Sequence, residues 1–326
     1  LSPLFDLNQV SVEHRYFGTS VPDSQFDFLN IWQAAQDHHV ILQALKSVYP
    51  GNWISSGASK GGNAAVFHRR FFPEDVVGTV AYVTPILLQE EDSRYLTYYE
   101  NQGTADCREK IRNYQRNVLE KIDSVTLYFD DYIAQVNQDY GTSITFEILD
   151  YKGFVYHSIR EDYPFEFWSS ETASCNSIPD IDASAVQLFE HYVEVMDIFL
   201  FFSDWGVNFW TPYAYQAKTE LGNYAFDLSH LSDLEMNIPQ LVEFPGISNF
   251  DSSVMQDILS WFESEATEVI LIYGAEDPWS IASIPNPAKE SVIWIMNPNT
   301  KHSTRIEDLL AYDKDKVMDR INSWIE

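Results

Sequence analysis

Positive charge is scarce in this sequence. Its 326 residues include 20 lysines and arginines against 49 aspartates and glutamates, so the formal net charge at pH 7 is −29. A surface of this sign repels the phosphates of nucleic acids and the anionic headgroups of lipids. We therefore expect no nucleic-acid partner.

Long hydrophobic runs are also lacking. A helix that crosses a bilayer needs about 20 consecutive apolar residues. The best candidate, 195–205 (VMDIFLFFSDW), is shorter and contains two aspartates. We expect no membrane-spanning helix. The sequence also does not begin with the charged and then apolar pattern of a signal peptide.

Cysteine is limited to Cys107 and Cys175. The sequence leaves open whether they pair in an oxidising compartment or remain two buried thiols, and neither has the spacing of a metal site. The run Asp37, His38 and His39 resembles a ligand cluster. However, adjacent side chains on a helix diverge by about 100°, so they are poorly placed to hold one ion. We expect no metal and no cofactor.

Five segments rich in β-branched and aromatic residues predict buried strands. They are 10–17 (VSVEHRYF), 53–57 (WISSG), 77–84 (VGTVAYVT), 268–274 (EVILIYG) and 291–297 (SVIWIMN). Helical spacing of apolar residues predicts helices over 28–49, 60–70 and 305–325. Strands that alternate with helices predict an α/β fold, with a mostly parallel sheet covered by helices on both faces.

The alternation stops between 84 and 267, where long helical patterns take over. Two of them are 107–136 and 184–202. An insertion of this size between two strands is expected to form a cap over the carboxyl ends of the sheet, where open α/β sheets hold their ligands. We expect a core of 1–88 and 266–326 and a helical cap of 89–265.

The motif G-x-S-x-G occurs at 57–61 (GASKG), directly after a predicted strand and before a predicted helix. A serine hydroxyl is a weak nucleophile at neutral pH and needs a base within reach, which in turn needs a carboxylate. Glycines on both sides allow the sharp turn that exposes Ser59, and the Lys60 amide then becomes an oxyanion donor. The alternative is an ordinary loop of glycine and serine.

Two later loops carry the partners that such a serine requires. Asp277 follows the fourth predicted strand and His302 follows the fifth, in the chain order serine, acid, histidine. Each has an ordinary alternative, as a turn aspartate before Pro278 and as a neighbour of a helix cap. Glu276 competes with Asp277, which fits the turn better. The combination favours a triad of Ser59, Asp277 and His302.

Several segments in combination resemble a known family. They are 13–18 (EHRYFG), 31–39 (IWQAAQDHH), 57–62 (GASKGG), 69–86 (RRFFPEDVVGTVAYVTPI), 273–280 (YGAEDPWS) and 301–306 (KHSTRI). Together they resemble the tripeptidyl aminopeptidase family of secreted bacterial serine peptidases. That family is similar to the prolyl carboxypeptidase and dipeptidyl peptidase group, which shares the EHR-Y-G stretch, the G-x-S-x-G-G turn that carries the serine (the nucleophile elbow) and a helical cap.

The resemblance implies an α/β-hydrolase fold, the same triad, and release of short peptides, tripeptides above all, from free amino termini. It also implies a secreted or periplasmic location, where a disulfide between Cys107 and Cys175 is favoured. One feature departs from the family. About three strands normally precede the EHR-Y-G strand, and the loop after the third supplies a second oxyanion donor, but here only 1–9 precede it. We expect a fragment whose amino-terminal strands are missing. The alternatives are that an amino-terminal piece has been cleaved away or that the fold is trimmed.

An exopeptidase also needs a carboxylate near the ammonium group of its substrate. Glu13 and Glu90 are candidates, with an ion pair between Glu13 and Arg15, or a solvated acidic face, as the alternatives. Trp279 is expected to form a pocket wall. The sequence thus predicts a serine exopeptidase acting on peptides. Its rivals are an esterase or lipase on the same fold and a non-catalytic binding protein. Residue preference and oligomeric state stay open.

Overall fold

The computed structural model describes residues 1–326 except 23–24, 197–200, 240–243 and 245–248. The chain divides into two compact units. The sheet unit contains Leu1–Asp92, Tyr215–Asn223 and Ser248–Glu326, and the helical unit contains Ser93–Ala214 and Tyr224–Ile247. Residues 215–223 and most of 248–265, which the sequence placed in the cap, therefore cluster with the sheet.

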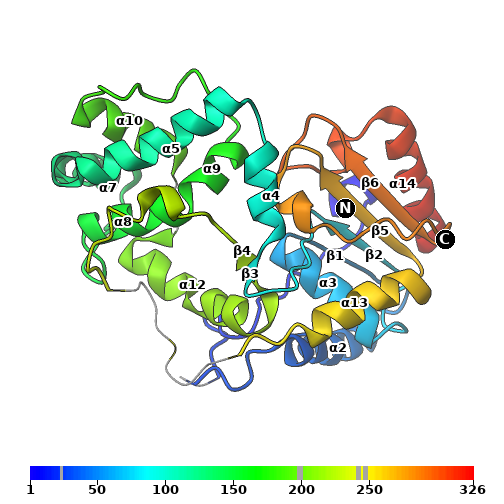
Figure 1. The fold of residues 1–326 in the computed structure, drawn as a ribbon. Coiled ribbons are helices and arrows are strands. Elements are labelled where there is room, and N and C mark those ends of the chain that lie inside the picture. Colours follow the sequence, from blue (N-terminus) through cyan, green and yellow to red (C-terminus); the bar gives the residue numbers. More distant parts are fainter. Residues whose placement is uncertain (23–24, 197–200, 240–243, 245–248) are drawn as a thin grey trace. The chain divides into compact units, whose positions relative to one another are not determined.

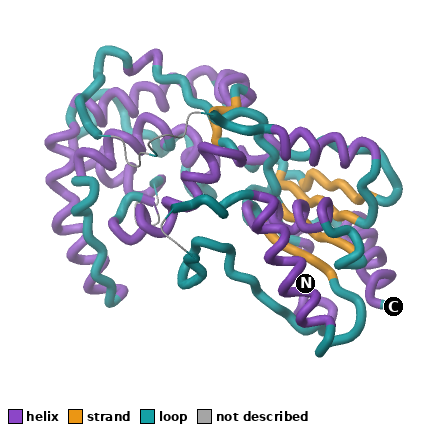
Figure 2. The backbone as a smooth tube through the Cα atoms, turned by 90° about the horizontal axis from the view of Figure 1, so that it is seen from below, coloured by secondary structure: helices purple, strands orange, loops and turns teal. Residues whose placement is uncertain are grey.

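The sheet unit is built on four parallel strands in the order β1 (Ile54–Ala58), β2 (Gly78–Tyr82), β5 (Val269–Gly274) and β6 (Val292–Asn297). These strands lie side by side in orange in Figure 2. Every residue of β2 and β5 is buried, as expected for the central strands of a sheet covered on both faces. Four of the five predicted strands are confirmed.

Helices cover both faces of this sheet. α14 (Ala311–Ile325) places Val317, Ile321 and Trp324 in one apolar cluster with alternate residues of the strands, such as Val80 and Ile270. α3 (Lys60–Phe71) packs against β1 and β2, and Figure 1 shows it on the other side of the sheet from α14. The α/β prediction is confirmed.

Further helices complete the sheet unit. They are α1 (Ser2–Phe5), α2 (Ile31–Lys46) and α13 (Ser253–Ser264), with a π-helix η2 (Ala217–Leu221) and the short 3-10 helices η4 (Pro278–Ala282) and η5 (Ile306–Asp308). α2 begins where the Asn30 side chain accepts a hydrogen bond from the Gln33 amide. β3 (Glu91–Asp92) and β4 (Asn223–Tyr224) form a separate two-stranded sheet.

The predicted strand over 10–17 is wrong. This segment has no strand, and Val10 and Val12 are largely exposed. A turn replaces it, with Tyr16 and Gly18 both in the left-handed region at φ 68° and 54°. Alternating hydrophobicity favours a strand only where a neighbouring strand supplies hydrogen bonds. Among the described residues, no strand pairs with this segment.

The helical unit contains the helices α4 (Arg94–Asn101), α5 (Ala105–Glu120), α6 (Ile122–Val125), α7 (Phe129–Tyr140), α8 (Tyr151–Glu161), α9 (Tyr163–Ser169), α10 (Ala185–Val195) and most of α12 (Asp204–Gln216), with turns η1 (Thr126–Tyr128) and η3 (Ser229–Leu231). Its core is rich in buried aromatic rings. Cys107 and Cys175 form a disulfide across a separation of 68 residues. The helical pattern over 107–136 is confirmed, although it forms several consecutive helices, from α5 to α7, rather than one. The pattern over 184–202 is helical to Val195, and 197–200 lie outside the described residues.

No helix in the described parts of the chain combines the length and the apolar character needed to cross a membrane.

Candidate active site

Ser59 lies between the last residue of β1 and the first residue of α3, with φ 53° and ψ −124°. A positive φ is uncommon for a residue with a side chain and persists only where its surroundings enforce it. Here the Ser59 amide donates to the Tyr82 carbonyl over 2.9 Å, and the Ser59 carbonyl accepts from the Asn63 amide over 3.0 Å. Both ends of the turn are therefore held, one by β2 and one by α3.

Two of the neighbouring glycines are required by close packing. A Cβ on Gly57 would lie 2.1 Å from the Gly61 carbonyl oxygen, and a Cβ on Gly62 would lie 2.0 Å from Thr84 Oγ1. A Cβ on Gly61 would meet nothing within 4 Å. The motif glycine before Ser59 therefore allows the turn to close, whereas the one after it leaves open space beside the helix terminus.

Asp277 and His302 are joined by a hydrogen bond. His302 Nδ1 lies 2.8 Å from Asp277 Oδ2, and the other carboxylate oxygen accepts from the Trp279 amide over 3.0 Å. The Asp277 side chain is buried, whereas the imidazole is about one third exposed. An ionised carboxylate only accepts hydrogen bonds, so it holds the proton of a neutral imidazole on Nδ1 and leaves Nε2 as a base.

The three residues share one edge of the sheet. Ser59 follows β1, Asp277 follows β5, and His302 lies in the loop after β6, and these strands are parallel. The carboxyl ends of parallel strands lie at the same edge. No hydrogen bond within the described residues joins the Ser59 hydroxyl to His302. Such contacts are often long in unliganded enzymes and tighten when substrate binds.

Lys60 begins α3, so its amide is one of the first amides of the helix, which have no partner inside it. Its side chain stands over the Phe17 ring at 5.4 Å. Burial lowers the pKa of this amine to about 7. Burial lowers the pKa of His14 to about 4, and the neighbouring Lys60 lowers it further. Burial also lowers the pKa of His38 to about 4, with a further contribution from the neighbouring His68. At neutral pH the two histidines are therefore uncharged.

Glu13 is exposed and accepts a hydrogen bond from the Ser20 hydroxyl over 2.6 Å. Its alternative partner, Arg15, instead forms two hydrogen bonds with Asp37, at 2.7 and 2.6 Å. Glu90 forms an ion pair with Lys218 at 2.8 Å. Among the described residues, neither carboxylate forms a hydrogen bond or an ion pair with Ser59, Asp277 or His302.

The two residues on either side of the Asp277 turn, Glu276 and Trp279, differ in whether they lie near His302. The Trp279 ring centre lies 6.4 Å from that of His302, so the indole stands beside the imidazole. Glu276 is exposed, and its amide donates to the Thr300 carbonyl over 2.9 Å. Of the two adjacent acids, Asp277 is the one that contacts His302.

The sequence reasoning missed Gly274, the last residue of β5. A Cβ there would lie 2.5 Å from the carbonyl oxygens of both Thr300 and Lys301. The loop that carries His302 thus passes directly over the end of β5, which is what brings the imidazole to Asp277. A glycine at the end of a buried strand was the available signal.

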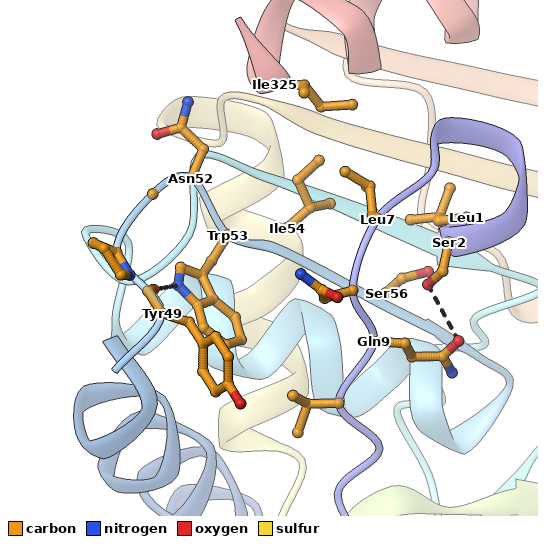
Figure 3. A pocket seen from close by; sticks show the side chains of 14 residues that line it. Leu1, Ser2, Leu7, Gln9, Tyr49, Asn52, Trp53, Ile54, Ser56 and Ile325 are labelled. Atoms are coloured by element: carbon orange, nitrogen blue, oxygen red, sulfur yellow. Dashed lines mark hydrogen bonds between the residues drawn. The ribbon is translucent and has the colours of Figure 1, made fainter. Parts of the chain in front are cut away.

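A cavity of about 580 Å³ lies beside the outer edge of β1, lined by residues such as Leu7, Gln9, Trp53 and Ile54 (Figure 3). Its lining includes no side chain of Asp, Glu, Lys, Arg or His. It therefore offers no acidic or basic side chain for acid–base chemistry. Among the described residues, no cluster of three or more potential ligands could hold a metal ion.

Comparison with known proteins decides the family. Residues 2–326 match the family described as PS-10 peptidase S37. The chain belongs to the PS-10 peptidase S37 family. The resemblance predicted from the sequence is confirmed, and the chain is a serine peptidase with a parallel sheet covered by helices.

The relatives differ in sequence identity and in how much of each protein the match covers. This chain is 31% identical over 339 residues to a prolyl tri/tetrapeptidyl aminopeptidase of Streptomyces mobaraensis, and the match covers 98% of this chain and 68% of that protein. It is 32% identical over 131 residues to the lysosomal Pro-X carboxypeptidase of Mus musculus, and this match covers 35% of this chain and 26% of that protein. A solved proline iminopeptidase of Mycobacterium smegmatis is 14% identical, with a TM-score of 0.43, covering 93% of this chain and 74% of that one.

Proposed function

We propose that the protein is a serine exopeptidase that releases short peptides, tripeptides above all, from free amino termini. The observation that carries the proposal is the hydrogen bond between His302 and the buried Asp277, at the same sheet edge as the strained Ser59 turn. The length of the released peptide is supported by the named activity of the Streptomyces relative.

In the proposed reaction, His302 Nε2 takes the Ser59 proton as the serine oxygen bonds to the substrate carbonyl carbon. Asp277 keeps the imidazole oriented and stabilises its charged form. The Lys60 amide donates to the oxygen that becomes negative. The imidazolium then protonates the leaving amine as the peptide bond breaks, which leaves an acyl-enzyme on Ser59. Water, deprotonated by His302, attacks this ester and returns the serine hydroxyl.

Recognition of the free amino terminus is assigned to acidic side chains, with Glu13 and Glu90 as the candidates and Trp279 as a pocket wall. Because Glu90 is paired with Lys218, it would have to exchange this partner for the substrate ammonium. Within the described part of the chain, Glu13 has no ion-pair partner and accepts a hydrogen bond from the Ser20 hydroxyl, so it needs no such exchange. Glu13 is thus the simpler of the two assignments.

We further propose that the protein works outside the cytoplasm. The disulfide between Cys107 and Cys175 supports this, because such bonds persist mainly in oxidising compartments.

The test combines a covalent probe with a peptide panel. A fluorophosphonate should label the wild-type chain and fail to label Ser59→Ala and His302→Ala variants whose circular dichroism is unchanged. Chromogenic tripeptides with a free amino terminus should be cleaved, and their acetylated counterparts should not. Equal cleavage of both forms would remove the aminopeptidase assignment. Turnover of short acyl esters without any peptide turnover would favour an esterase.

A further inference from the structure

Val83, the first residue after β2, has an unusual backbone conformation. Its φ is 44°, in the left-handed region, although the residue is β-branched and buried. Such a conformation costs free energy and persists only where surrounding contacts enforce it. One of these contacts is a hydrogen bond of 2.7 Å from the Val83 amide to the Ile272 carbonyl of β5. The segment 83–86 therefore has a course that its surroundings impose.

The turn that carries Ser59 packs on this segment. The Asn63 side chain donates through Nδ2 to the Pro85 carbonyl over 2.9 Å, while the Asn63 amide holds the Ser59 carbonyl. A Cβ on Gly62 would lie 2.0 Å from Thr84 Oγ1, so the first turn of α3 lies directly against Thr84. A displacement of Thr84 or Pro85 would therefore be passed on to the serine.

The segment after Asp277 contacts the same residues. η4 begins directly after Asp277 and ends at Ala282, whose carbonyl accepts a hydrogen bond from the Ile86 amide over 2.7 Å. Pro85 and Ser283 form an antiparallel bridge. The segment 83–86 thus contacts both the turn that carries the serine and the turn that begins at Asp277.

The Tyr273 side chain joins these parts. Tyr273 lies in β5 and is buried; its hydroxyl donates to the Thr84 carbonyl and accepts from the Ile284 amide, both over 3.1 Å. A phenol can make both bonds at once, since it has one proton to donate and an oxygen that accepts. The Ile284 carbonyl in turn accepts from the Trp294 indole over 2.7 Å. Burial raises the pKa of Tyr273, so the hydroxyl keeps its proton at neutral pH.

We propose that Tyr273 is a positioning residue for the peptidase reaction. Its hydroxyl ties together two backbone segments, one of which supports the serine and the other the carboxylate of the triad. It forms no hydrogen bond with Ser59, Asp277 or His302 in the part of the chain that the structure describes, so it acts through Thr84 and Ile284. The inference rests on the triad of the proposed function. Reacting groups must be held closely, because a misplacement of about 1 Å can lower a rate about 100-fold.

The test is the variant Tyr273→Phe, which removes one oxygen and keeps the ring. For a chromogenic tripeptide, kcat should fall by about ten- to hundredfold. KM should stay unchanged, because the lost bond orients reacting groups and does not bind substrate. The rate constant of fluorophosphonate labelling should fall with kcat, while the fraction of chains that is finally labelled stays complete.

The matched control is Tyr114→Phe. Tyr114 is a buried tyrosine of the helical unit, and its hydroxyl donates to the Leu188 carbonyl over 2.8 Å. Both variants should unfold at a lower urea concentration than the wild type, because each leaves a buried carbonyl without its donor. Only Tyr273→Phe should lose kcat. A purely structural role would make the two variants behave alike.

A second variant, Asn63→Ala, removes the hydrogen bond between the turn of the serine and Pro85. It should also lower kcat with KM unchanged. Combined with Tyr273→Phe, it should lower kcat by less than the product of the two single effects, because both act through the segment 83–86.

The outcomes separate this inference from the proposed function. Wild-type kcat in Tyr273→Phe, or the same loss of kcat in Tyr114→Phe, would overturn the inference and leave the proposed function intact. If Tyr273→Phe does not fold, Asn63→Ala decides, and an unchanged kcat would again overturn the inference. A wild-type chain that neither reacts with the probe nor cleaves peptides would overturn the proposed function and this inference together.

Discussion

The Asp277 carboxylate lies 2.8 Å from His302 Nδ1 and is 1% exposed, whereas its neighbour Glu276 points to solvent. A buried carboxylate in this position fixes the tautomer of the imidazole and compensates the charge that develops on it. The pair sits on the loops after β5 and β6, and Gly274 allows the two loops to approach.

The first prediction separates the two adjacent acids. Asp277→Asn should lower kcat for a tripeptide substrate by about 10⁴, because an amide favours the wrong tautomer of His302. Glu276→Gln, as the matched control, should retain the wild-type rate, since its side chain is exposed and only its amide is engaged. Steady-state kinetics on both variants decides the question. Equal losses in the two variants would show that the acid has been assigned to the wrong residue.

The second prediction concerns the glycines around Ser59. Gly57→Ala should unfold the turn or abolish probe labelling, because the new Cβ would lie 2.1 Å from a backbone oxygen that cannot move without disturbing α3. Gly61→Ala meets open space inside a helix, so it should increase the free energy of unfolding by up to about 1 kcal/mol. Urea denaturation followed by circular dichroism measures the stability of both variants, and fluorophosphonate labelling measures the reactivity of Ser59 in Gly57→Ala. A tolerated Gly57→Ala would contradict the close packing described here.

Much of the sheet unit was predictable because its signals are local. β2 and β5 are short apolar runs bounded by turn residues, and the elbow is spelled out by five consecutive residues. The chain order of serine, acid and histidine, each placed after a strand, predicted that Asp277 and His302 come together, and the hydrogen bond between them agrees with this prediction. Parallel pairing brings such loops together automatically, so a pattern along the chain was enough.

The remainder depends on contacts between distant segments. The segment 10–17 has the pattern of a strand, but no described strand pairs with it, and the positive φ of Tyr16 has no sequence signal. The residues around the two cysteines left open whether they pair, and only the family resemblance favoured a disulfide, because pairing needs the two Cα atoms within reach, here 5.2 Å. The paired state of Glu90 depends on Lys218, 128 residues away. Side chains of this kind are placed by tertiary packing.

The third prediction is about the disulfide in the helical unit. It closes a separation of 68 residues, for which the chain-entropy model gives about 4 kcal/mol and measured cases usually give 2–4 kcal/mol. The double variant Cys107→Ser with Cys175→Ser should lose about this much stability in urea denaturation. Dithiothreitol should destabilise the wild type to a similar extent and leave the double variant unchanged. A wild type that is indifferent to dithiothreitol would show that the bond is not formed in solution.

The fourth prediction follows from a buried carboxylate in the helical unit. Asp162 accepts a hydrogen bond from the Tyr224 hydroxyl over 2.6 Å, and burial raises its pKa to about 7. In the unfolded chain the pKa of an aspartate is about 3.9. Between these values the folded state retains a proton that the unfolded state has released. The contribution of Asp162 to stability is therefore present at low pH and is lost as the pH rises from about 4 to about 7.

Asp162→Asn should remove this loss, because the amide is uncharged at every pH and its oxygen can still accept from Tyr224. Each unit of pKa difference corresponds to about 1.4 kcal/mol, so relative to the wild type the variant should gain on the order of 2–4 kcal/mol between about pH 4 and pH 8. Glu171→Gln, at an exposed position of the same unit, is the matched control and should follow the wild-type profile. The measurement is the free energy of unfolding in urea across this range. Parallel profiles for Asp162→Asn and the wild type would mean that Asp162 is already ionised in the folded protein near pH 4.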